Sequence, residues 1–225
     1  WISDRDGEPR PYAARLNEEL VRTAPEQRTS TAGGFSGLAL LRHDGEAWLA
    51  ACRQEEREAA LSITRLDPKT AARRGDELVI RRSETVTFSS PVLAARGERA
   101  VLGWVERPLM GGGAATRAFL LELDAEARGV GEPIAIASSS GDPSALRLYC
   151  DGNRCQGALD ARPPEGTAIE AFEWEPSSAP RAQLLAYRAS ASADPPAFAL
   201  ADGAIFHADR VERRGLLRRL GVSWR

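Results

Sequence analysis

The feature that most constrains the fold is a hairpin pattern that recurs along the whole chain. Four segments read as an apolar strand, a short glycine-containing turn and a second apolar strand: LALLRHDGEAWLAACR, VLAARGERAVLGWVE, LRLYCDGNRCQGALDA and FALADGAIFHADR. Their turn glycines are separated by 52, 55 and 51 residues, at Gly45, Gly97, Gly152 and Gly203. Self-similarity at a fixed period of this size indicates a repeat architecture with one supersecondary unit per repeat.

Two further landmarks recur with nearly the same spacing. An alternating strand follows each hairpin and ends in an acid or an amide, at Asn17, Asp67, Asp124 and Glu175. A further β-rich run comes next, as ELVIRRS, EPIAIASSS and AQLLAYRAS. The motifs FSSP, GDPS and ADPP then restart the cycle, because Pro and Asp form turns and do not continue a strand ladder. Each unit is therefore expected to contain four strands.

Period-2 alternation, as in LSITRLD, fits these runs better than a helical period. A four-stranded antiparallel unit of about 53 residues, repeated, is typical of a β-propeller blade, which buries both faces of its sheet against its neighbours. We predict an all-β propeller with a half-blade at 1–31, blades at about 37–85, 91–140 and 144–190, and a partial blade at 197–225. Two arrangements stay open: four blades closed by strand exchange between the termini, or part of a larger propeller.

A family resemblance agrees with this fold. The chain contains a series of elements: an apolar strand, an Asp/Asn-Gly turn flanked by cysteines, a second apolar strand and an ARL(D/N) run. This series resembles the propeller-type repeats of secreted and cell-surface proteins of myxobacteria and related GC-rich bacteria. The opening WISDRDGEPRPYAARLN is similar to the end of a second strand plus a third strand in those repeats. The resemblance covers nearly the whole chain and implies architecture, with hardly any chemistry.

Cys150 and Cys155 stand on either side of a four-residue turn. Residues that face each other in an antiparallel pair have Cα atoms about 5.5 Å apart, which is within disulfide range. We predict a structural disulfide, with two reduced core thiols as the alternative. Because disulfides persist outside the reducing cytosol, we expect an extracytoplasmic bacterial protein, whether periplasmic, secreted or on the cell surface.

A metal site at these cysteines is not expected. The other ligands at hand are Cys52, His43 and His207, and none has the spacing of a zinc site. Cys52 is expected to be a buried small hydrophobic residue. Asp4 and Asp6 could begin a calcium loop, but the later ligands of such a loop are missing, so we interpret both as turn residues.

Composition excludes several function classes. The 30 basic and 32 acidic residues nearly cancel, so no overall field favours nucleic acid or an anionic membrane. No apolar run approaches the roughly 20 residues that span a bilayer. The chain also lacks the common hydrolase, phosphate-loop and dinucleotide motifs. The segment GGFSG comes close to the Gly-x-Ser-x-Gly pattern of a nucleophile elbow, but Leu38 stands where the last glycine belongs.

The remaining candidate residues are histidines and tryptophans. His43 is expected to be exposed beside its turn, and His207 lies within a strand without a visible catalytic partner. Trp48, Trp104 and Trp174 fall inside strands, and we expect them to form core.

We therefore expect no cofactor, no metal and no catalytic residue. The predicted function is a non-catalytic, extracytoplasmic propeller that acts as a protein-interaction or scaffold module, with another protein or further blades of a longer chain as its partner. Two alternatives stay open: a carbohydrate-binding propeller, which would take a glycan partner, and a propeller hydrolase or lyase with carboxylates converging on its funnel.

Overall fold

The computed structural model describes residues 1–5, 7–30, 32–109, 115–163, 166–176, 180–188, 197–201, 204–211 and 214–220. Within these ranges the chain forms eighteen strands and no helix. No helix in this part of the chain could therefore span a membrane.

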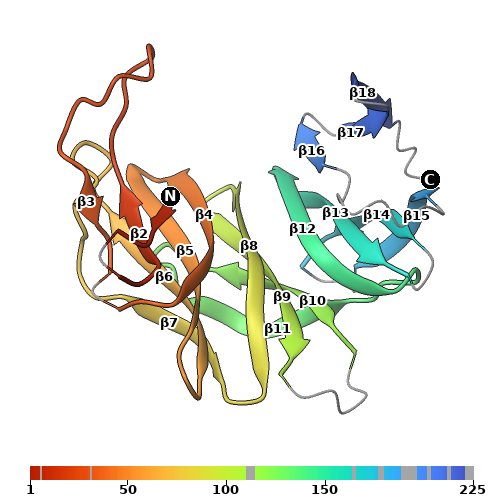
Figure 1. The fold of residues 1–225 in the computed structure, drawn as a ribbon, viewed down its shortest axis with the longest axis horizontal. Coiled ribbons are helices and arrows are strands. Elements are labelled where there is room, and N and C mark those ends of the chain that lie inside the picture. The colour runs from red at the N-terminus through yellow and green to blue at the C-terminus, as the bar shows by residue number, and fades with distance from the viewer. Residues whose placement is uncertain are drawn as a thin grey trace.

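The strands form five antiparallel sheets in chain order (Figure 1). Sheet 1 contains β1 (Ile2–Ser3), β2 (Arg10–Ala13) and β3 (Gln27–Arg28). Sheet 2 contains β4 (Phe35–His43), β5 (Glu46–Gln54), β6 (Ala59–Leu66) and β7 (Leu78–Ser83). Sheet 3 contains β8 (Val86–Arg96), β9 (Arg99–Pro108), β10 (Arg117–Leu123) and β11 (Gly129–Ile136).

The last two sheets continue this order. Sheet 4 contains β12 (Asp142–Asp151), β13 (Arg154–Arg162), β14 (Thr167–Trp174) and β15 (Arg181–Arg188). Sheet 5 contains β16 (Ala197–Ala201), β17 (Ala204–Val211) and β18 (Arg214–Leu220). The predicted all-β fold of four-stranded antiparallel units is thus confirmed in sheets 2 to 4.

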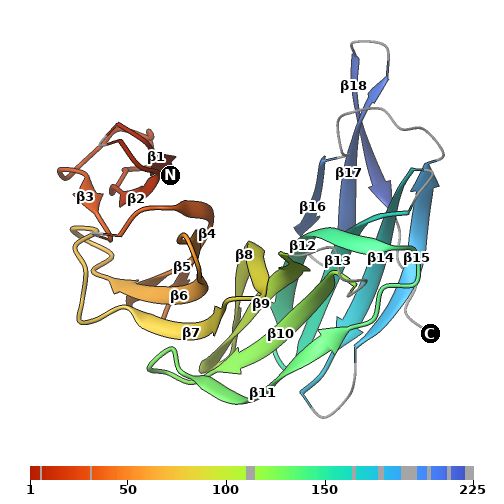
Figure 2. The ribbon, with the colours of Figure 1, turned by 60° about the horizontal axis from the view of Figure 1, so that its bottom comes forward.

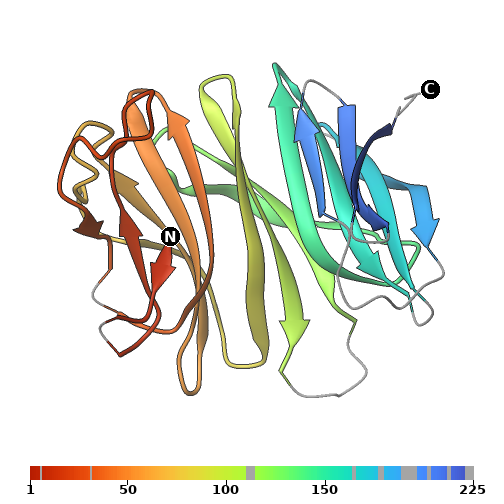
Figure 3. The same cartoon turned by 45° about the horizontal axis from the view of Figure 1, so that its top comes forward.

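The sheets follow one another around an arc (Figure 1), and Figure 2 shows the strands of sheets 3 and 4 in order, from β8 to β11 and from β12 to β15. The strands β4, β8 and β12, here called the first strands, lie side by side on the inner side of the arc and run in the same direction (Figure 3). The end of the molecule at which they begin is called the first-strand rim below.

The core lies between neighbouring sheets. One cluster, which includes Trp48, Leu61 and Trp104, fills the space between sheets 2 and 3. A second cluster, which includes Leu159 and Trp174, fills the space between sheets 3 and 4. All three tryptophans are at most 2% exposed, which confirms their prediction as core. Because a lone sheet would leave both faces in water, this core exists only through repetition.

The acid or amide that ends each third strand has the same role in three sheets. Its Oδ1 atom accepts hydrogen bonds of 2.8–3.0 Å from backbone N–H groups of the following turn, at Asn17, Asp67 and Asp124. A residue with a left-handed backbone follows in each turn, Leu20 (φ 61°), Ala71 (φ 60°) and Ala127 (φ 65°). Asp and Asn side chains readily replace a backbone acceptor in a turn, which explains this landmark at Asn17, Asp67 and Asp124.

The same landmark identifies the strands of sheet 1. Asn17 follows β2 as Asp67 follows β6, so β2 is a third strand, and β1 and β3 correspond to second and fourth strands. Among the described residues, sheet 1 has no counterpart of the first strands, and β1 pairs only with β2. Among the described strands, none from one end of the chain pairs with a strand from the other end, and each end forms a three-stranded sheet of its own.

Neighbouring sheets are linked at the hairpin turns, at the end opposite the first-strand rim. His43, the last residue of β4, places Nε2 3.2 Å from the carbonyl of Glu98, in the next hairpin turn. Arg96, the last residue of β8, donates from Nε to the carbonyl of Asn153 in the following turn, also at 3.2 Å. The expected exposure of His43 is therefore wrong: it is 6% exposed and packs edge-on against Trp48.

The structure joins Cys150 and Cys155 in a disulfide between β12 and β13. Cys52 is a free thiol in β5 with no exposed surface, and burial raises its pKa to about 12. Because the thiolate is the reactive form, Cys52 is an inert core residue.

Candidate functional site

Each first strand has an irregularity close to its beginning. The register shifts between Phe35 and Gly37 in β4, between Ser89 and Val92 in β8, and between Pro143 and Ala145 in β12. β-Bulges bend a strand and redirect its side chains, and they are frequent at rims and next to active sites. The three bulges therefore mark the first-strand rim as the place where the regular repeat is modified.

The bulged segments pack directly on one another. Ser90 has a φ of 48°, a value that is uncommon for a residue other than glycine. Its Oγ donates to the carbonyl of Ser144 at 3.2 Å, and the Ser144 Oγ donates to the carbonyl of Asp160 at the same distance. A Cβ at Gly37 would lie 2.9 Å from Cδ of Pro91. The absence of a side chain at Gly37 therefore lets β4 approach β8 closely.

The resulting surface carries hydroxyl groups and one acid. Ser36 is exposed, and Ser90 and Ser144 are half-buried, whereas the Oγ of Ser89 is buried. Asp142 opens β12 and is exposed. Among the residues of β4, β8 and β12, the only other carboxylate is Asp151, which lies at the opposite end of β12.

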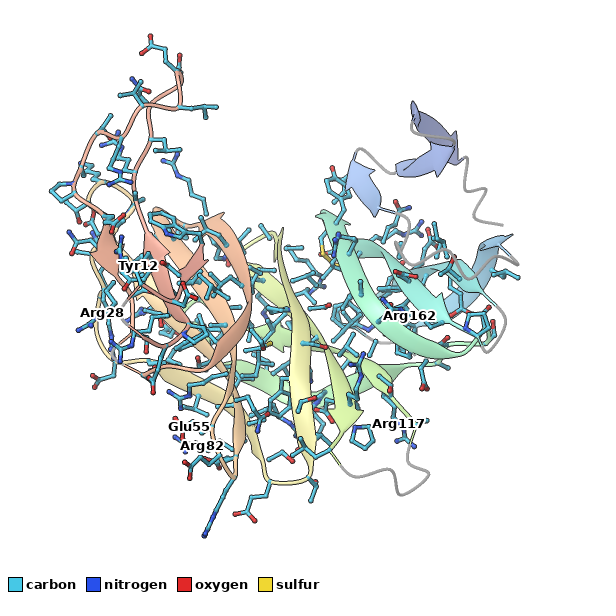
Figure 4. All side chains as sticks on the ribbon, in the orientation of Figure 1. Tyr12, Arg28, Glu55, Arg82, Arg117 and Arg162 are labelled. Carbon is cyan, nitrogen blue, oxygen red and sulfur yellow. A yellow bond between two sulfur atoms is a disulfide. The ribbon has the colours of Figure 1, made fainter. Side chains whose placement is uncertain are left out.

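Asp142 faces a cation across its sheet. Its partner in the β12–β13 register is Arg162, which is also exposed (Figure 4). The pair places one carboxylate and one guanidinium on adjacent strands at the rim. An exposed acid beside hydroxyls and a guanidinium can exchange a proton with a ligand and hydrogen-bond a polyhydroxylated molecule.

A buried carboxylate lies behind this part of the rim. Glu170 is on β14 and has no exposed surface. Its Oε1 accepts hydrogen bonds from the backbone N–H of Ser139 at 2.8 Å and from the Ser139 Oγ at 2.6 Å. In the same loop, the Ser138 Oγ donates to the carbonyl of Gly141 at 2.7 Å. Glu170 therefore holds the loop between β11 and β12, which leads directly into Asp142.

The repeat shows which residues take this position in the other sheets. By their register with the second strands, Ser62 in β6 and Phe119 in β10 correspond to Glu170 in β14. Ser62 is buried, and Phe119 packs on the core between sheets 2 and 3. Burying a charge is costly unless its hydrogen bonds are supplied. In sheet 4 the serine loop supplies these hydrogen bonds to Glu170.

The hydrogen bonds determine the charge of Glu170. Burial raises its pKa, but the hydroxyls of Ser139, Ser140 and Ser138 and the Ser139 N–H lower it, and the pKa of Glu170 ends below its usual 4.5. The side chain is therefore an ionised acceptor at neutral pH, and its role is to hold the loop.

This charge predicts a pH dependence. Between the lowered pKa of folded Glu170 and 4.5, the value for an unperturbed glutamate, the unfolded chain binds more protons, so stability rises with pH and is lost as the pH falls. We expect the free energy of unfolding to fall less steeply below pH 4.5 in Glu170→Gln than in the wild type, as measured by urea denaturation at several pH values. Equal slopes for the two proteins would contradict this assignment.

The other sequence candidates are structural residues or lie outside the described residues. Asp4 is part of a turn, in which the N–H of Gly7 donates to the Asp4 carbonyl at 2.7 Å. Asp6 and the side chain of His207 are outside the described residues. Within the described part of the chain, no group of three or more His, Cys, Asp and Glu side chains is placed to hold a metal ion.

Comparison with known proteins gives structural neighbours only. No family model matches the sequence, and no curated protein matches it. The structure resembles an endo-arabinase from Bacteroides thetaiotaomicron with a TM-score of 0.58 at 11% identity, covering 100% of this chain and 89% of that chain. It also resembles an exo-1,5-α-L-arabinanase from a bovine ruminal metagenomic library with a TM-score of 0.54 at 12% identity, covering 99% and 92%.

A further neighbour is a polysaccharide lyase of family PL25, an ulvan lyase bound to a glycan, with a TM-score of 0.64 at 8% identity, covering 94% of this chain and 57% of that chain. At these identities the likeness concerns the fold, and it confirms the predicted β-propeller.

The neighbours correct one prediction. The expectation that the protein is not an enzyme is wrong in the light of these structures, which are glycan-degrading enzymes. That expectation relied on the absence of a catalytic sequence motif. A propeller brings together residues from separate sheets, so a site of this kind leaves no short motif in the sequence.

Proposed function

We propose that this chain is the propeller of an enzyme that degrades a glycan, a hydrolase or lyase, with its active site at the first-strand rim. The observation that carries the proposal is the exposed Asp142 beside hydroxyls of three bulged first strands, with a dedicated buried carboxylate behind its loop. The scaffold function predicted from the sequence has no comparable observation in its favour.

The chemistry of the rim supports a glycan as the substrate. Sugar hydroxyls need both donors and acceptors. The Ser36 hydroxyl can supply both, and the hydroxyls of Ser90 and Ser144, which donate within the chain, can accept. Asp142 is the carboxylate proposed to transfer a proton, because it is exposed at the rim and next to Arg162 in the register. Glu170 is proposed to position the loop that carries Asp142, since it has no exposed surface itself.

The disulfide supports an extracytoplasmic location, because a cystine bridge persists in oxidising compartments. A polymeric glycan is also a substrate that is degraded outside the cytoplasm when it is too large to be imported. The resemblance to surface-exposed bacterial repeat proteins points to the same location.

The proposal is tested with the whole chain and a panel of arabinan, sialylated glycan and ulvan. Hydrolysis is measured as new reducing ends, and lyase action as the ultraviolet absorbance of unsaturated products. We expect turnover of at least one glycan, and a loss of about 10²–10⁴-fold in rate for Asp142→Asn, the typical contribution of a proton-transferring side chain.

The matched control is Asp151→Asn, which changes an exposed aspartate of the same strand at the opposite end. We expect this variant to keep the wild-type rate. Full activity of Asp142→Asn would remove Asp142 from the mechanism, and binding of glycans without turnover would refute the enzymatic function.

A further inference from the structure

Sheet 4 buries a second carboxylate, which has no role in the site described so far. Asp160 lies on β13 and is only 3% exposed. The same position is taken by Cys52 in β5 and by Val105 in β9, both without exposed surface. Each of the three pairs with the first-strand residue that borders the bulge, which is Gly37, Ser89 or Ala145. The position is therefore apolar in sheets 2 and 3, and sheet 4 has an acid there.

An acid at this position is costly for the fold. A carboxylate that is taken out of water loses its hydration. Replacing a buried charged group by an apolar residue of similar size is often neutral or stabilising. Buried acids with charged neighbours are frequent at functional sites, which makes Asp160 a candidate for a role other than packing.

The register places Asp160 on the same face of sheet 4 as Asp142. Residues that pair directly share a face, and so do residues two apart on one strand. Asp142 pairs with Arg162, which stands two residues after Asp160. Leu159 and Phe172, on the opposite face, pack on the core between sheets 3 and 4. Asp142, Arg162 and Asp160 therefore form one group on the face that is turned away from sheet 3.

The spacing within this group suits two carboxylates that act together. Diagonal neighbours on antiparallel strands have Cα atoms about 7–8 Å apart, and Asp142 and Asp160 are such neighbours. In glycoside hydrolases, carboxyl groups about 6.5–9.5 Å apart leave room for a water molecule beside the scissile bond, and those about 5–5.5 Å apart do not. The diagonal spacing of Asp142 and Asp160 matches the wider class.

The two acids also differ in exposure, as an acid and a base would. Asp142 is exposed at the rim, where it can take a proton from solvent and give it to a leaving group. Asp160 lies two residues farther from the rim and is nearly buried. A base that activates water needs only one oxygen within reach of that water. Arg162, on the same face, favours the ionised form of a neighbouring carboxylate.

We infer that Asp160 is the second carboxylate of the active site, and that the enzyme is a hydrolase that inverts the anomeric centre. Asp160 takes a proton from a water molecule, and the oxygen of that water forms a bond to the anomeric carbon. The bond from this carbon to the leaving oxygen breaks, and Asp142 gives its proton to that oxygen. The proton on Asp160 then returns to Asp142 through solvent. The inference rests on the proposed function, which it narrows from a hydrolase or lyase to a hydrolase.

The test uses the whole chain and whichever of arabinan, sialylated glycan and ulvan the wild type cleaves fastest. We expect Asp160→Asn to lower the turnover rate about 10²–10⁴-fold, and nuclear magnetic resonance of the first wild-type products to show an inverted anomer.

A second variant separates catalysis from stability. Asp160→Cys introduces the residue that β5 has at this position. We expect it to fold with a urea midpoint at or above that of the wild type, because it removes a buried charge, and to lose turnover by the same factor as Asp160→Asn. An acid with a purely structural role would instead lower the midpoint and the rate together.

The matched control is Asp151→Asn, which changes an exposed aspartate at the opposite end of β12 and is expected to keep the wild-type rate and midpoint. Four outcomes overturn the inference: the wild-type rate in either Asp160 variant, a midpoint that falls with the rate in both, a retained anomer, or unsaturated products. The last two are measured on the wild type and do not depend on folding of the variants. In all four cases, loss of turnover in Asp142→Asn would leave the proposed function standing, whereas a wild type that cleaves none of the glycans overturns both.

Discussion

Replacing Trp104 with alanine is expected to lower the free energy of unfolding by about 3–5 kcal/mol, the usual cost of truncating a large buried aromatic side chain. Trp104 has no exposed surface, stacks on Phe119 with ring centroids 5.6 Å apart, and donates from Nε1 to Glu106 at 2.9 Å. Its removal leaves a cavity between sheets 2 and 3 and one carboxylate without its indole donor. Urea denaturation followed by far-ultraviolet circular dichroism measures the change.

The control is Trp1→Ala. Trp1 is 49% exposed and stacks loosely on Tyr12, with ring centroids 6.1 Å apart, so its loss is expected to cost about 0.5 kcal/mol, as for other surface substitutions. Equal effects of the two substitutions would mean that the core between sheets 2 and 3 is not the main source of stability.

Gly157→Ala is expected to destabilise the protein by about 1–3 kcal/mol, because it overpacks the core. A methyl group at this position of β13 would overlap the ring of Phe172, which stands opposite in the register with β14. The ring has no exposed surface, so moving it would displace the core residues that pack around it. The change is measured as the shift of the urea midpoint at constant slope.

A second substitution separates this clash from a general effect on the strand. In a Phe172→Leu background the side chain opposite Gly157 is shorter, so Gly157→Ala is expected to cost less than it does in the wild type. A double-mutant cycle gives this coupling directly. Strict additivity of the two changes would show that the cost comes from the β13 backbone and not from the ring.

The fold could be predicted from the sequence because the residues that mark its repeat have local structural roles. Asp67 and Asp124 accept hydrogen bonds within their own turns, and Gly45 and Gly152 adopt positive φ in the hairpin turns. Such requirements act over a few residues, so they recur at a fixed spacing that one sequence displays. The two termini were harder to predict, since the repeat pattern alone does not decide whether their strands pair with each other or within each end of the chain.

The candidate site was much harder to predict from the sequence. Glu170 lies in the alternating run IEAFEWE, where an acid normally marks a solvent-facing position. In a propeller both faces of a sheet are covered by neighbouring sheets, so alternation no longer separates inside from outside. The partner of Glu170 is Ser139, 31 residues away, and a loop of three serines reads as an ordinary connection. A comparison of the third strands, Ser62 with Glu170, is the sequence signal that could have identified it.

The same reasoning explains the error on His43. A histidine beside an Asp-Gly turn suggests an exposed loop, and the hairpin alone would leave it exposed. The neighbouring hairpin, which ends near Glu98, covers it. Exposure in a repeat protein is thus decided by the next unit along the chain.

The hydrogen bonds from His43 to Glu98 and from Arg96 to Asn153 also bear on how such a protein can change in size. Each one connects a unit to its immediate successor, and in both cases the donor ends a first strand and the acceptor lies in the next hairpin turn. A gene duplication that inserts one unit therefore also supplies the groups that hydrogen-bond to both neighbouring units. A deletion of one unit leaves the remaining units with both a donor and an acceptor for each link. Proteins of this type can accordingly gain or lose whole modules during evolution while the remaining modules stay intact.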